Sequence, residues 1–425
     1  MVICVVPNVY EFNRRFRTPV EAPQSMDLFS QIHFSLFALG GSGLVVQGMP
    51  LDPELLGYWN SEVSFAPEFV YPELVTGNLC ADLLRDNSAM NAVRALGERR
   101  MAYWGYTRHS HDIDRALGRE ADCNLWRVAD VLDSKTGSRD AMLYASSGGG
   151  VRIGPALSVS GSNREVRDVV REMRAIWGEL IIKPALGWGG KGSVIFGPRS
   201  DAERLEVQIE NLRAFSRDGA LIVEPFLGNI EMNVSPSIDC AVSPSEVSSR
   251  QWSGVMLMED ITCSGTIYGS FDSPLQSSQK IEILEYSRRI SEYGRGLGYE
   301  GWLDVDFLLC DGRVYATEIN ARHTGGTVPI LLAERLLGES WEDSNAVFSI
   351  DRVECGSDSF PMIVGSLRNF FRRAYEVEDF FITAFQRIGS GKSLISVWGY
   401  GSGRNWTLQR ASDLSRDVRN MCRAC

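Results

Sequence analysis

A short run of acidic and amide side chains has the composition of a site for a hard metal ion. Asp306 is followed later in the chain by Glu318, and Asn320 lies two residues further on. Carboxylate and amide oxygens suit Mg²⁺, which usually shares one or two protein carboxylates with water and substrate phosphates. These residue types therefore make Asp306, Glu318 and Asn320 candidates for a site that holds a hard cation.

A second segment has the composition of a phosphate-binding loop. Between Lys183 and Ser193 the chain reads KPALGWGGKGS, and Lys191 lies among the glycines. Glycine lets backbone N–H groups approach phosphate oxygens without interference from Cβ, and ammonium groups offset the phosphate charge. Taken alone, such a loop is equally typical of a glycine-rich hairpin with surface lysines. The glycines concerned are Gly187, Gly189, Gly190 and Gly192.

The elements that must position these residues follow from the spacing of apolar side chains. Residues 163–177 form one apolar stripe with helical periodicity, which ends at Gly178. The elements expected after this helix are, in order, a strand at 180–184, a strand at 193–196, a helix that ends at Gly219, a strand at 221–226, strands at 254–258 and 265–271, a helix at 278–294 and a hairpin at 302–320. This mixture of strands and helices predicts an α/β protein.

The combination of these motifs resembles the ATP-grasp superfamily over about residues 135–326. The similarity also rests on Glu224 at the end of a buried strand, on Glu231, and on Arg322 after the Glu-Ile-Asn-Ala run. Members of this superfamily fold two α+β subdomains around ATP and join a carboxylate to an amine through an acyl phosphate. The resemblance therefore implies an enzyme that uses ATP and Mg²⁺ to form a C–N bond.

The resemblance implies roles for the matching residues. Asp306, Glu318 and Asn320 would hold one or two magnesium ions, for which Mn²⁺ can substitute. Lys183 and Lys191 would contact the ATP phosphates, and Lys191 is also a predicted catalytic residue. Glu224 would lie at the adenine hinge, and Glu231 would bind the ribose hydroxyls. With Arg139, the predicted nucleotide site is completed by Gly187, Gly189, Gly190, Gly192 and Ser193.

Arg139 departs from the family pattern. The superfamily usually has a lysine at this place, upstream of the glycine-rich loop, and Lys135 is close by in the sequence. Which of the two residues contacts ATP is left open. Arg322 is the second predicted catalytic residue, because the resemblance places it against the substrate carboxylate or the acyl phosphate. His323 is predicted to act on the amine or simply to pack.

The metal hypothesis sets a condition on the hairpin. With a two-residue turn at 311–312, Asp306 and Glu318 fall on opposite faces of the sheet. With a three-residue loop at 310–312, Asp304 faces Glu318 and Asp306 lies diagonal to it. We therefore predict an odd-numbered loop or a β-bulge. Asp304 is predicted either to support the metal site or to bind a cationic group of the substrate.

The chain length predicts more than one domain. Residues 1–132 open with an apolar strand and predict an α/β domain in front of the ATP-grasp core. The core is predicted at residues 133–337, and a small C-terminal domain at residues 338–425. This architecture is similar to that of pheganomycin-type peptide ligases. The similarity implies that an amino-acid-like carboxylate is coupled to the N-terminal amine of a peptide or amino acid, with release of ADP and phosphate, in the biosynthesis of an antibiotic or other peptide natural product.

Two other functions stay open. One is an ATP-grasp kinase that phosphorylates a small molecule and never couples an amine. The other is a nucleotide-binding regulatory module without catalysis, against which the intact set of Asp306, Glu318 and Asn320 argues.

Bulk composition limits the partners. The chain has 44% hydrophobic and 23% charged residues and a net charge of -11, which disfavours nucleic acid as a partner. No apolar stretch reaches the ~18 residues of a membrane span. The odd number of dispersed cysteines favours a reducing, cytoplasmic compartment. The expected partners are a small carboxylate and an amine, and a homodimer is left open.

Two motifs are weaker. Gly389-Ser-Gly-Lys-Ser393 resembles the end of a phosphate-binding P-loop, but the required first glycine is Gln386, and a loop near the active site is the better interpretation. His109 and His111 could chelate a metal ion from a strand, but no third ligand lies near them, so surface histidines are favoured.

Overall fold

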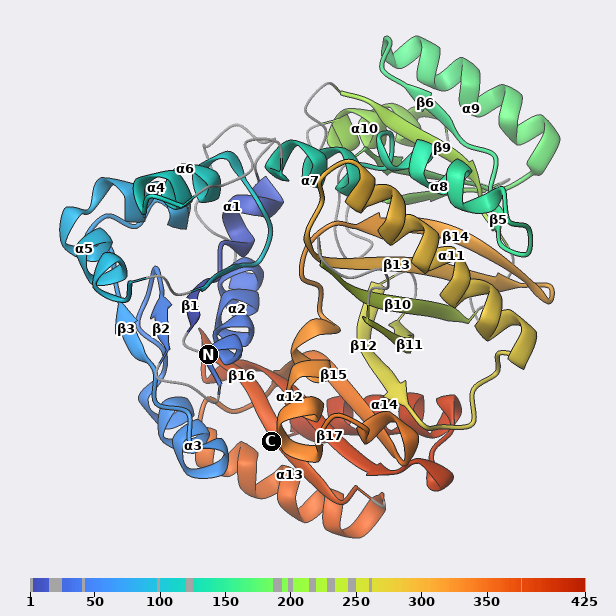
Figure 1. Cartoon of the computed structure of the whole chain (residues 1–425). Helices are drawn as coiled ribbons and strands as arrows, with labels where there is room; N and C mark the ends of the chain where they lie inside the picture. Colours follow the sequence, from blue (N-terminus) through green and yellow to red (C-terminus); the bar gives the residue numbers. More distant parts are fainter. Residues whose placement is uncertain are drawn as a thin grey trace.

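The chain is described here by a computed structural model, which covers residues 3–14, 25–39, 43–97, 100–119, 125–185, 193–197, 202–213, 219–227, 234–243, 250–259, 262–375 and 377–424. Within these ranges the strands form three sheets, with helices arranged around them (Figure 1). None of the helices in these ranges is long and apolar enough to cross a membrane.

The N-terminal part contains a parallel sheet with the strand order β3-β2-β1-β4. Its strands are β1 (Ile3–Val6), β2 (Leu44–Val46), β3 (Glu68–Val70) and β4 (Arg100–Tyr103). The helices of this part are α1 (Val9–Arg14), α2 (Ser25–Phe34), η1 (Ser35–Ala38), α3 (Pro53–Val63), α4 (Leu79–Arg85), α5 (Asn87–Ala95), α6 (Arg108–Ala116) and α7 (Leu125–Asp133). The predicted α/β character of this part is confirmed, because parallel strands are buried by helices on both faces.

A small antiparallel sheet contains the two strands that flank the glycine-rich loop in the sequence. Its strand order is β6-β9-β7-β8, from β6 (Leu157–Val159), β7 (Leu180–Pro184), β8 (Val194–Phe196) and β9 (Leu221–Pro225). The helices α9 (Asn163–Trp177) and α10 (Ala202–Arg213) pack against it. Helix α9 has the predicted bounds: the side chain of Ser162 caps its first turn, and Gly178 ends it with a φ of 79°. The end of its apolar stripe stays accessible, since Ile176 is 74% exposed.

A nine-stranded sheet runs through the rest of the molecule, in the order β16-β17-β15-β12-β11-β10-β13-β14-β5. Six of its strands come before the C-terminal segment: β5 (Arg152–Ile153), which lies at one edge, β10 (Ser235–Val242), β11 (Arg250–Glu259), β12 (Thr262–Gly269), β13 (Gly301–Cys310) and β14 (Arg313–Asn320). The helices α8 (Ser138–Ser146) and α11 (Ser277–Gly296) pack on β10, β13 and β14, where Ile283, Ile290 and Leu303 share one apolar core.

The C-terminal segment extends the same sheet. It contributes β15 (Asn345–Cys355), β16 (Asp379–Gly389) and β17 (Lys392–Ser402), and its helices are α12 (Thr327–Leu337), η3 (Trp341–Asp343), α13 (Phe360–Ala374), η4 (Gly403–Asn405) and α14 (Leu408–Ala424). Strand β12 pairs with β15, so hydrogen bonding continues across the predicted boundary at residue 338. The division into three domains stays a prediction.

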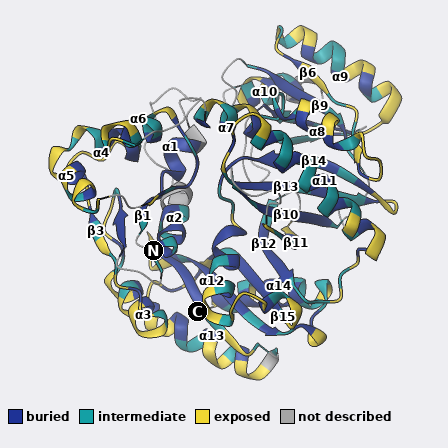
Figure 2. Ribbon diagram, in the orientation of Figure 1, coloured by how far each residue is buried: buried dark blue, intermediate teal, exposed yellow. Residues whose placement is uncertain are grey.

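The N-terminal part also packs on this C-terminal segment. Trp59 of α3 is fully buried, and its Nε1 donates a hydrogen bond to the carbonyl oxygen of Ile382 at 2.8 Å. Arg387 of β16 forms ion pairs with Asp52 and Glu54 at the start of α3. Figure 2 shows buried residues along the strands and exposed residues on the outward faces of α3, α9 and α13. The two ends of the chain therefore enclose one core.

Two weak motifs have ordinary structural roles. The Gly389–Ser393 segment forms the turn between β16 and β17, with positive φ at Gly389, Ser390 and Gly391. A strand follows it rather than a helix, so it lacks the context of a P-loop. His109 and His111 lie on helix α6, not on the strand considered for them, and His109 contacts Glu11 at 3.2 Å.

Candidate active site

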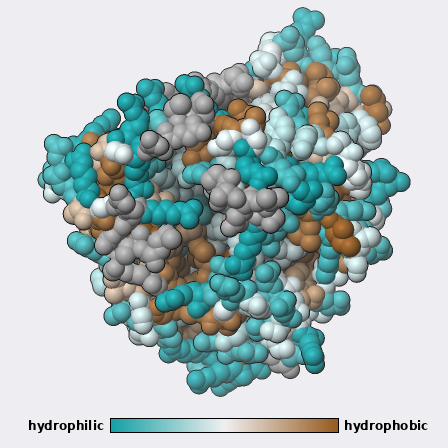
Figure 3. Space-filling model, viewed as in Figure 1, coloured by the Kyte–Doolittle hydropathy of each residue, from teal (hydrophilic) through white to brown (hydrophobic). Residues whose placement is uncertain are grey.

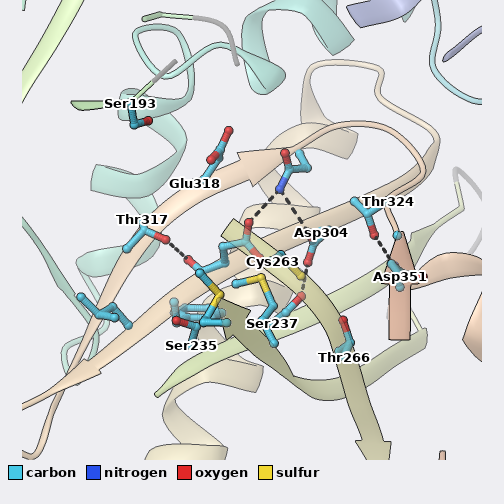
Figure 4. A pocket seen from close by; sticks show the side chains of 18 of the residues that line it. Ser193, Ser235, Ser237, Cys263, Thr266, Asp304, Thr317, Glu318, Thr324 and Asp351 are labelled. Atoms are coloured by element: carbon cyan, nitrogen blue, oxygen red, sulfur yellow. Dashed lines mark hydrogen bonds between the residues drawn. The ribbon is translucent and has the colours of Figure 1, made fainter. Parts of the chain in front are cut away.

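The predicted metal residues line a cavity of about 400 Å³ between the two antiparallel sheets and the N-terminal part. Residues of β7, β9, β13, β14, β15 and α2 contribute to its lining. Charged side chains line it from these strands and from neighbouring loops: Lys135, Lys183, Glu224, Asp304, Asp306, Glu318, Arg322, Asp351 and Arg352. The face of the molecule shown in Figure 3 is mostly hydrophilic, with scattered apolar residues. In Figure 4, Asp351 of β15 lies on the side away from Glu318, which we call the far end of the cavity.

Asp306 and Glu318 lie directly opposite each other on β13 and β14. The turn between the strands has two residues, with φ of 49° at Asp311 and 72° at Gly312, so the predicted three-residue loop is wrong. The alternative condition, a β-bulge, is met: the register shifts between Asp306 and Phe307, and Thr317 is the extra residue. Asp304 therefore faces Asn320, and the prediction that it faces Glu318 is also wrong.

The bulge is stabilised by Thr317 itself. Its Oγ1 donates a hydrogen bond at 3.1 Å to the backbone carbonyl oxygen of Asp306 (Figure 4). A bulge disrupts the local ladder of backbone hydrogen bonds, and side-chain donors commonly satisfy the freed carbonyl groups. The hydroxyl group of Thr317 therefore fixes the backbone beneath the Asp306 carboxylate.

Asn320 links two buried carboxylates. Its Nδ2 donates hydrogen bonds to Asp304 Oδ2 at 3.1 Å and to Asp306 Oδ2 at 3.0 Å, and Ser237 Oγ donates to Asp304 Oδ1 at 2.6 Å (Figure 4). Both oxygens of Asp304 are thus occupied. Asp306 Oδ1, by contrast, is buried without a hydrogen-bond partner among the described residues.

Burial and like charges raise the pKa of these acids. Burial is the main cause at Asp306, and Glu318 adds to it, so that the pKa of Asp306 rises to about 7. The pKa of Asp304 is raised well above its usual range by burial and by Asp306. Concentrated negative charge of this kind favours the binding of a cation.

Two lysines line the cavity, and each forms an ion pair with a glutamate. Lys135 Nζ lies 2.6 Å from Glu318 Oε1, and Lys183 Nζ lies 2.7 Å from Glu224 Oε2. Burial would lower the pKa of Lys183, but the charge of Glu224 and its hydrogen bond outweigh burial, so the pKa is raised. Lys183 therefore carries a positive charge beside Glu224.

Arg139 occupies a neighbouring position. Its Nη2 donates to the carbonyl oxygen of Gly154 at 2.8 Å, and its side chain lines a smaller cavity of about 130 Å³ that also borders Lys135 and Glu224. Lys135, in contrast, lines both cavities. The geometry thus brings Lys135 closer to the carboxylate pair than the predicted Arg139.

Part of the predicted nucleotide site lies outside the described residues. This applies to Gly187, Gly189, Gly190, Lys191, Gly192 and Glu231. Ser193, at the end of the glycine-rich loop, is described and lines the larger cavity (Figure 4).

Arg322 and His323 have different surroundings. Arg322 is buried at the cavity wall and forms an ion pair with Asp133. His323 stacks on Trp302, with ring centroids 5.5 Å apart, and burial lowers its pKa to about 3. It does not belong to the lining of the cavity. The packing alternative for His323 is the one that its contacts support.

Sequence reasoning missed several residues of the cavity. His33 of α2 and the pair Asp351 and Arg352 of β15 line its far end, far from the metal residues in sequence. Asp239 on β10 is buried beside it and accepts hydrogen bonds from Tyr268, Trp302 and Thr324. The sequence contains one signal for this pair: Asp351 and Arg352 are two charged residues directly after the apolar run that ends at Ile350.

Comparison with known proteins gives partial sequence matches and full-length structural matches. No family model matches the chain. The large chain of carbamoyl phosphate synthase from Clostridium botulinum (strain Loch Maree / Type A3) is 24% identical over 168 residues, 39% of this chain and 14% of that relative. L-propargylglycine--L-glutamate ligase from Streptantibioticus cattleyicolor is 30% identical over 141 residues, 32% of this chain and 27% of that enzyme. The chain therefore spans about one seventh of the carbamoyl phosphate synthase chain that it matches.

The structural matches decide the fold. Biotin carboxylase from Campylobacter jejuni, solved as a β-γ-ATP complex, matches with a TM-score of 0.59 at 12% identity, over 99% of this chain and 94% of that chain. N5-carboxyaminoimidazole ribonucleotide synthetase from Thermus thermophilus matches with a TM-score of 0.56 at 13% identity, over 100% and 99%. The chain has the ATP-grasp fold. The predicted ATP-grasp architecture, including the α/β part in front of the core, is thus confirmed.

Within the ATP-grasp fold the donor set fits magnesium. In the described ranges, no three or more His, Cys, Asp or Glu side chains are grouped so that they could hold a metal ion by themselves. The candidate site instead combines two carboxylates with one amide. Asp306 and Glu318 supply two carboxylates, and the amide of Asn320 has committed its nitrogen to hydrogen bonds, which leaves its oxygen for a cation. A site with so few protein ligands suits Mg²⁺ that completes its shell with water and phosphate oxygens.

Proposed function

We propose that this protein is an ATP-dependent ligase that activates a carboxylate as an acyl phosphate and couples it to an amine. The observation that carries the proposal is the convergence of Asp306 and Glu318 with Lys135 and Lys183 in one cavity of an ATP-grasp fold. Acidic metal ligands beside fixed cations are what phosphoryl transfer from ATP requires.

The two lysines would bind the ATP phosphates. Each is held by a carboxylate partner, so its ammonium group is placed before the nucleotide arrives. Glu224 lies 2.7 Å from Lys183 and lines both cavities, a position that suits contact with the nucleotide. Asp306, Glu318 and Asn320 would hold Mg²⁺, which offsets the charge of the phosphates when bound.

Arg322 would orient the acid substrate. Its guanidinium is fixed by Asp133, and its side chain lines the cavity wall next to the metal residues. A carboxylate held there attacks the γ-phosphorus atom, and the bond to ADP breaks. The amine then attacks the carbonyl carbon, the bond to phosphate breaks, and the nitrogen loses a proton. Exclusion of water once the substrates fill the cavity would limit hydrolysis of the acyl phosphate.

Two comparisons favour coupling to an amine over the kinase alternative. L-propargylglycine--L-glutamate ligase joins, by its name, one amino acid to another, and the large chain of carbamoyl phosphate synthase is a second relative. An amino-acid-like acid and the N-terminal amine of an amino acid or peptide are therefore the proposed substrates, and natural-product biosynthesis is the proposed setting.

One assay separates the three candidate functions. ADP release is measured with candidate acids alone, with candidate amines alone and with both, and the products are analysed by mass spectrometry. A ligase gives ADP and an amide only when both substrates are present. A phosphorylated small molecule without an amide would show a kinase, and nucleotide binding without turnover of any candidate would favour the regulatory module.

A further inference from the structure

The far end of the cavity contains a polar side chain that no described residue satisfies. His33 of α2 is 7% exposed and lines the cavity, and its Nε2 has no hydrogen-bond partner among the described residues. Burial lowers the pKa of His33 against the opposing effect of Asp351, so the imidazole is neutral at pH 7. In the tautomer protonated at Nδ1, the Nε2 atom is a free hydrogen-bond acceptor.

Asp351 faces the same end because β15 contains a bulge. Ile350 pairs with Val397 and Val353 pairs with Ile395, so Asp351 and Arg352 together oppose Ser396. Bulges next to active sites re-aim side chains, and here the second bulge residue, Arg352, has the left-handed φ of 55°. A strained bulge at the cavity wall points to a functional reason for its presence.

The C-terminal helix holds this bulge in place. Arg419 of α14 donates hydrogen bonds to the carbonyl oxygen of Asp351 at 2.7 Å and to that of Arg352 at 3.3 Å. The backbone nitrogen of Arg352 donates to Ser396 Oγ at 3.3 Å, and its Nη2 donates to the carbonyl oxygen of Cys263 at 2.6 Å. The guanidinium of Arg352 is thus anchored. Among the described residues, the carboxylate of Asp351 accepts one hydrogen bond, from Ser349.

Asp351 lies near the loop that carries Arg322. A Cβ atom built on Gly325, three residues after Arg322, would lie 3.8 Å from Asp351 Oδ2. In the view of Figure 4, Asp304 lies between Glu318 on one side and Asp351 on the other. The loop that carries the Arg322 cation and the Asp351 carboxylate therefore border the same cavity.

We propose that His33 and Asp351 form a subsite for the ammonium group of an amino-acid substrate whose carboxylate is activated. A carboxylate and an imidazole lone pair both accept hydrogen bonds, and an ammonium group donates three. Because His33 and Asp351 are only two ligands, the subsite suits a cation held by hydrogen bonds rather than a coordinated metal ion. This inference rests on the proposed function and names the residues that select an amino acid over a plain acid.

The test compares amino acids with their des-amino analogues. Hydroxylamine replaces the amine substrate, so that only the acid varies, and ADP and hydroxamate are measured for a panel of L-amino acids and the matching acids without the amino group. The wild-type protein is expected to use the best amino acid with a kcat/KM at least tenfold above that of its analogue. Equal use of both acids would overturn the subsite and leave the ligase function intact.

Variants of Asp351 and His33 test whether these residues discriminate between the amino acid and its analogue. Asp351→Asn and His33→Phe are expected to raise the KM for the amino acid at least tenfold, with unchanged use of the analogue and an unchanged KM for ATP. Asp358→Asn is the matched control, because Asp358 is exposed on the same segment. Equal losses for both acids would show a merely structural role and contradict the proposal.

Binding gives a readout that does not depend on turnover. The melting temperature is measured with and without each amino acid, for the wild type, Asp351→Asn and Asp358→Asn. Stabilisation of the wild type and the control, but not of Asp351→Asn, supports the subsite even if no acid releases ADP, in which case the proposed ligase function fails alone. Equal stabilisation of all three proteins would overturn the subsite.

Discussion

Asp306 lies directly opposite Glu318 on the hairpin of β13 and β14, and Thr317 is the additional residue that makes this pairing compatible with a two-residue turn. Without the bulge, Asp306 would pair with Thr317 and the side chain of Glu318 would point to the other face. The candidate metal site therefore depends on one residue that carries no charge and would not coordinate the ion.

The hydroxyl group of Thr317 should matter for both stability and metal binding. Thr317→Val keeps the shape of the side chain but removes the hydrogen bond to the carbonyl oxygen of Asp306. We expect a loss of about 1 kcal/mol and a melting temperature lower by about 2–4 °C. Calorimetry with Mg²⁺ and ADP should show about fivefold weaker metal binding. Thr262→Val on β12 serves as the control, and the same behaviour in both variants would argue against the role of Thr317.

Asp306 and Glu318 should both be required for metal binding, but their replacement should have different effects on the stability of the protein without metal. Asp306→Asn removes one of the buried negative charges, so we expect no detectable Mg²⁺ binding and a melting temperature without metal that is unchanged or higher. Glu318→Gln should lose metal binding too, but its stability should fall, because Lys135 loses its partner. Asp311→Asn, at the exposed turn of the same hairpin, is expected to behave as the wild type. Wild-type Mg²⁺ affinity in Asp306→Asn would exclude the assigned site.

Much of the fold follows from the local sequence. Helix α9 has its predicted bounds because an apolar stripe, a serine cap and a terminal glycine agree. Strand β7 also has its predicted bounds, 180–184, and the hairpin of β13 and β14 ends at the predicted Asn320. The position of the bulge could not be predicted, because alternation along β14 does not show which residue is unpaired. The register between β13 and β14 depends instead on which side chains pack between the sheets.

The candidate site was less predictable than the fold. Asp306, Glu318 and Asn320 lie in one hairpin, so their spacing carries the information. His33 and Asp351 come from α2 and β15, which border one cavity only because the N-terminal part packs on the C-terminal segment. A single sequence holds no local signal for a contact of that kind.

Lys183 should be required for turnover rather than for folding. Lys183→Met removes the charge that we assign to the ATP phosphates, and kcat should fall by about 10²–10³ or more. Glu224 would be left without its ion-pair partner, so the double variant Lys183→Met/Glu224→Gln should recover stability but not activity. Lys392→Met, which breaks an exposed ion pair with Glu354, is the control. ADP release and thermal melting are measured for all three, and near-normal turnover in the double variant would contradict the assignment.

A last prediction concerns the pH dependence of stability in the N-terminal part. Burial raises the pKa of Asp114 to about 6, although hydrogen bonding from Tyr103 opposes the shift. The folded state therefore keeps a proton on Asp114 that the unfolded state has already lost, so this residue lowers the free energy of unfolding as pH rises from about 4 to 6. Asp114→Asn keeps an acceptor for Tyr103 and removes the ionisation. Its melting temperature should exceed that of the wild type at pH 8 and approach it at pH 4, and a constant difference between the two proteins across this range would contradict the buried carboxylate as the cause.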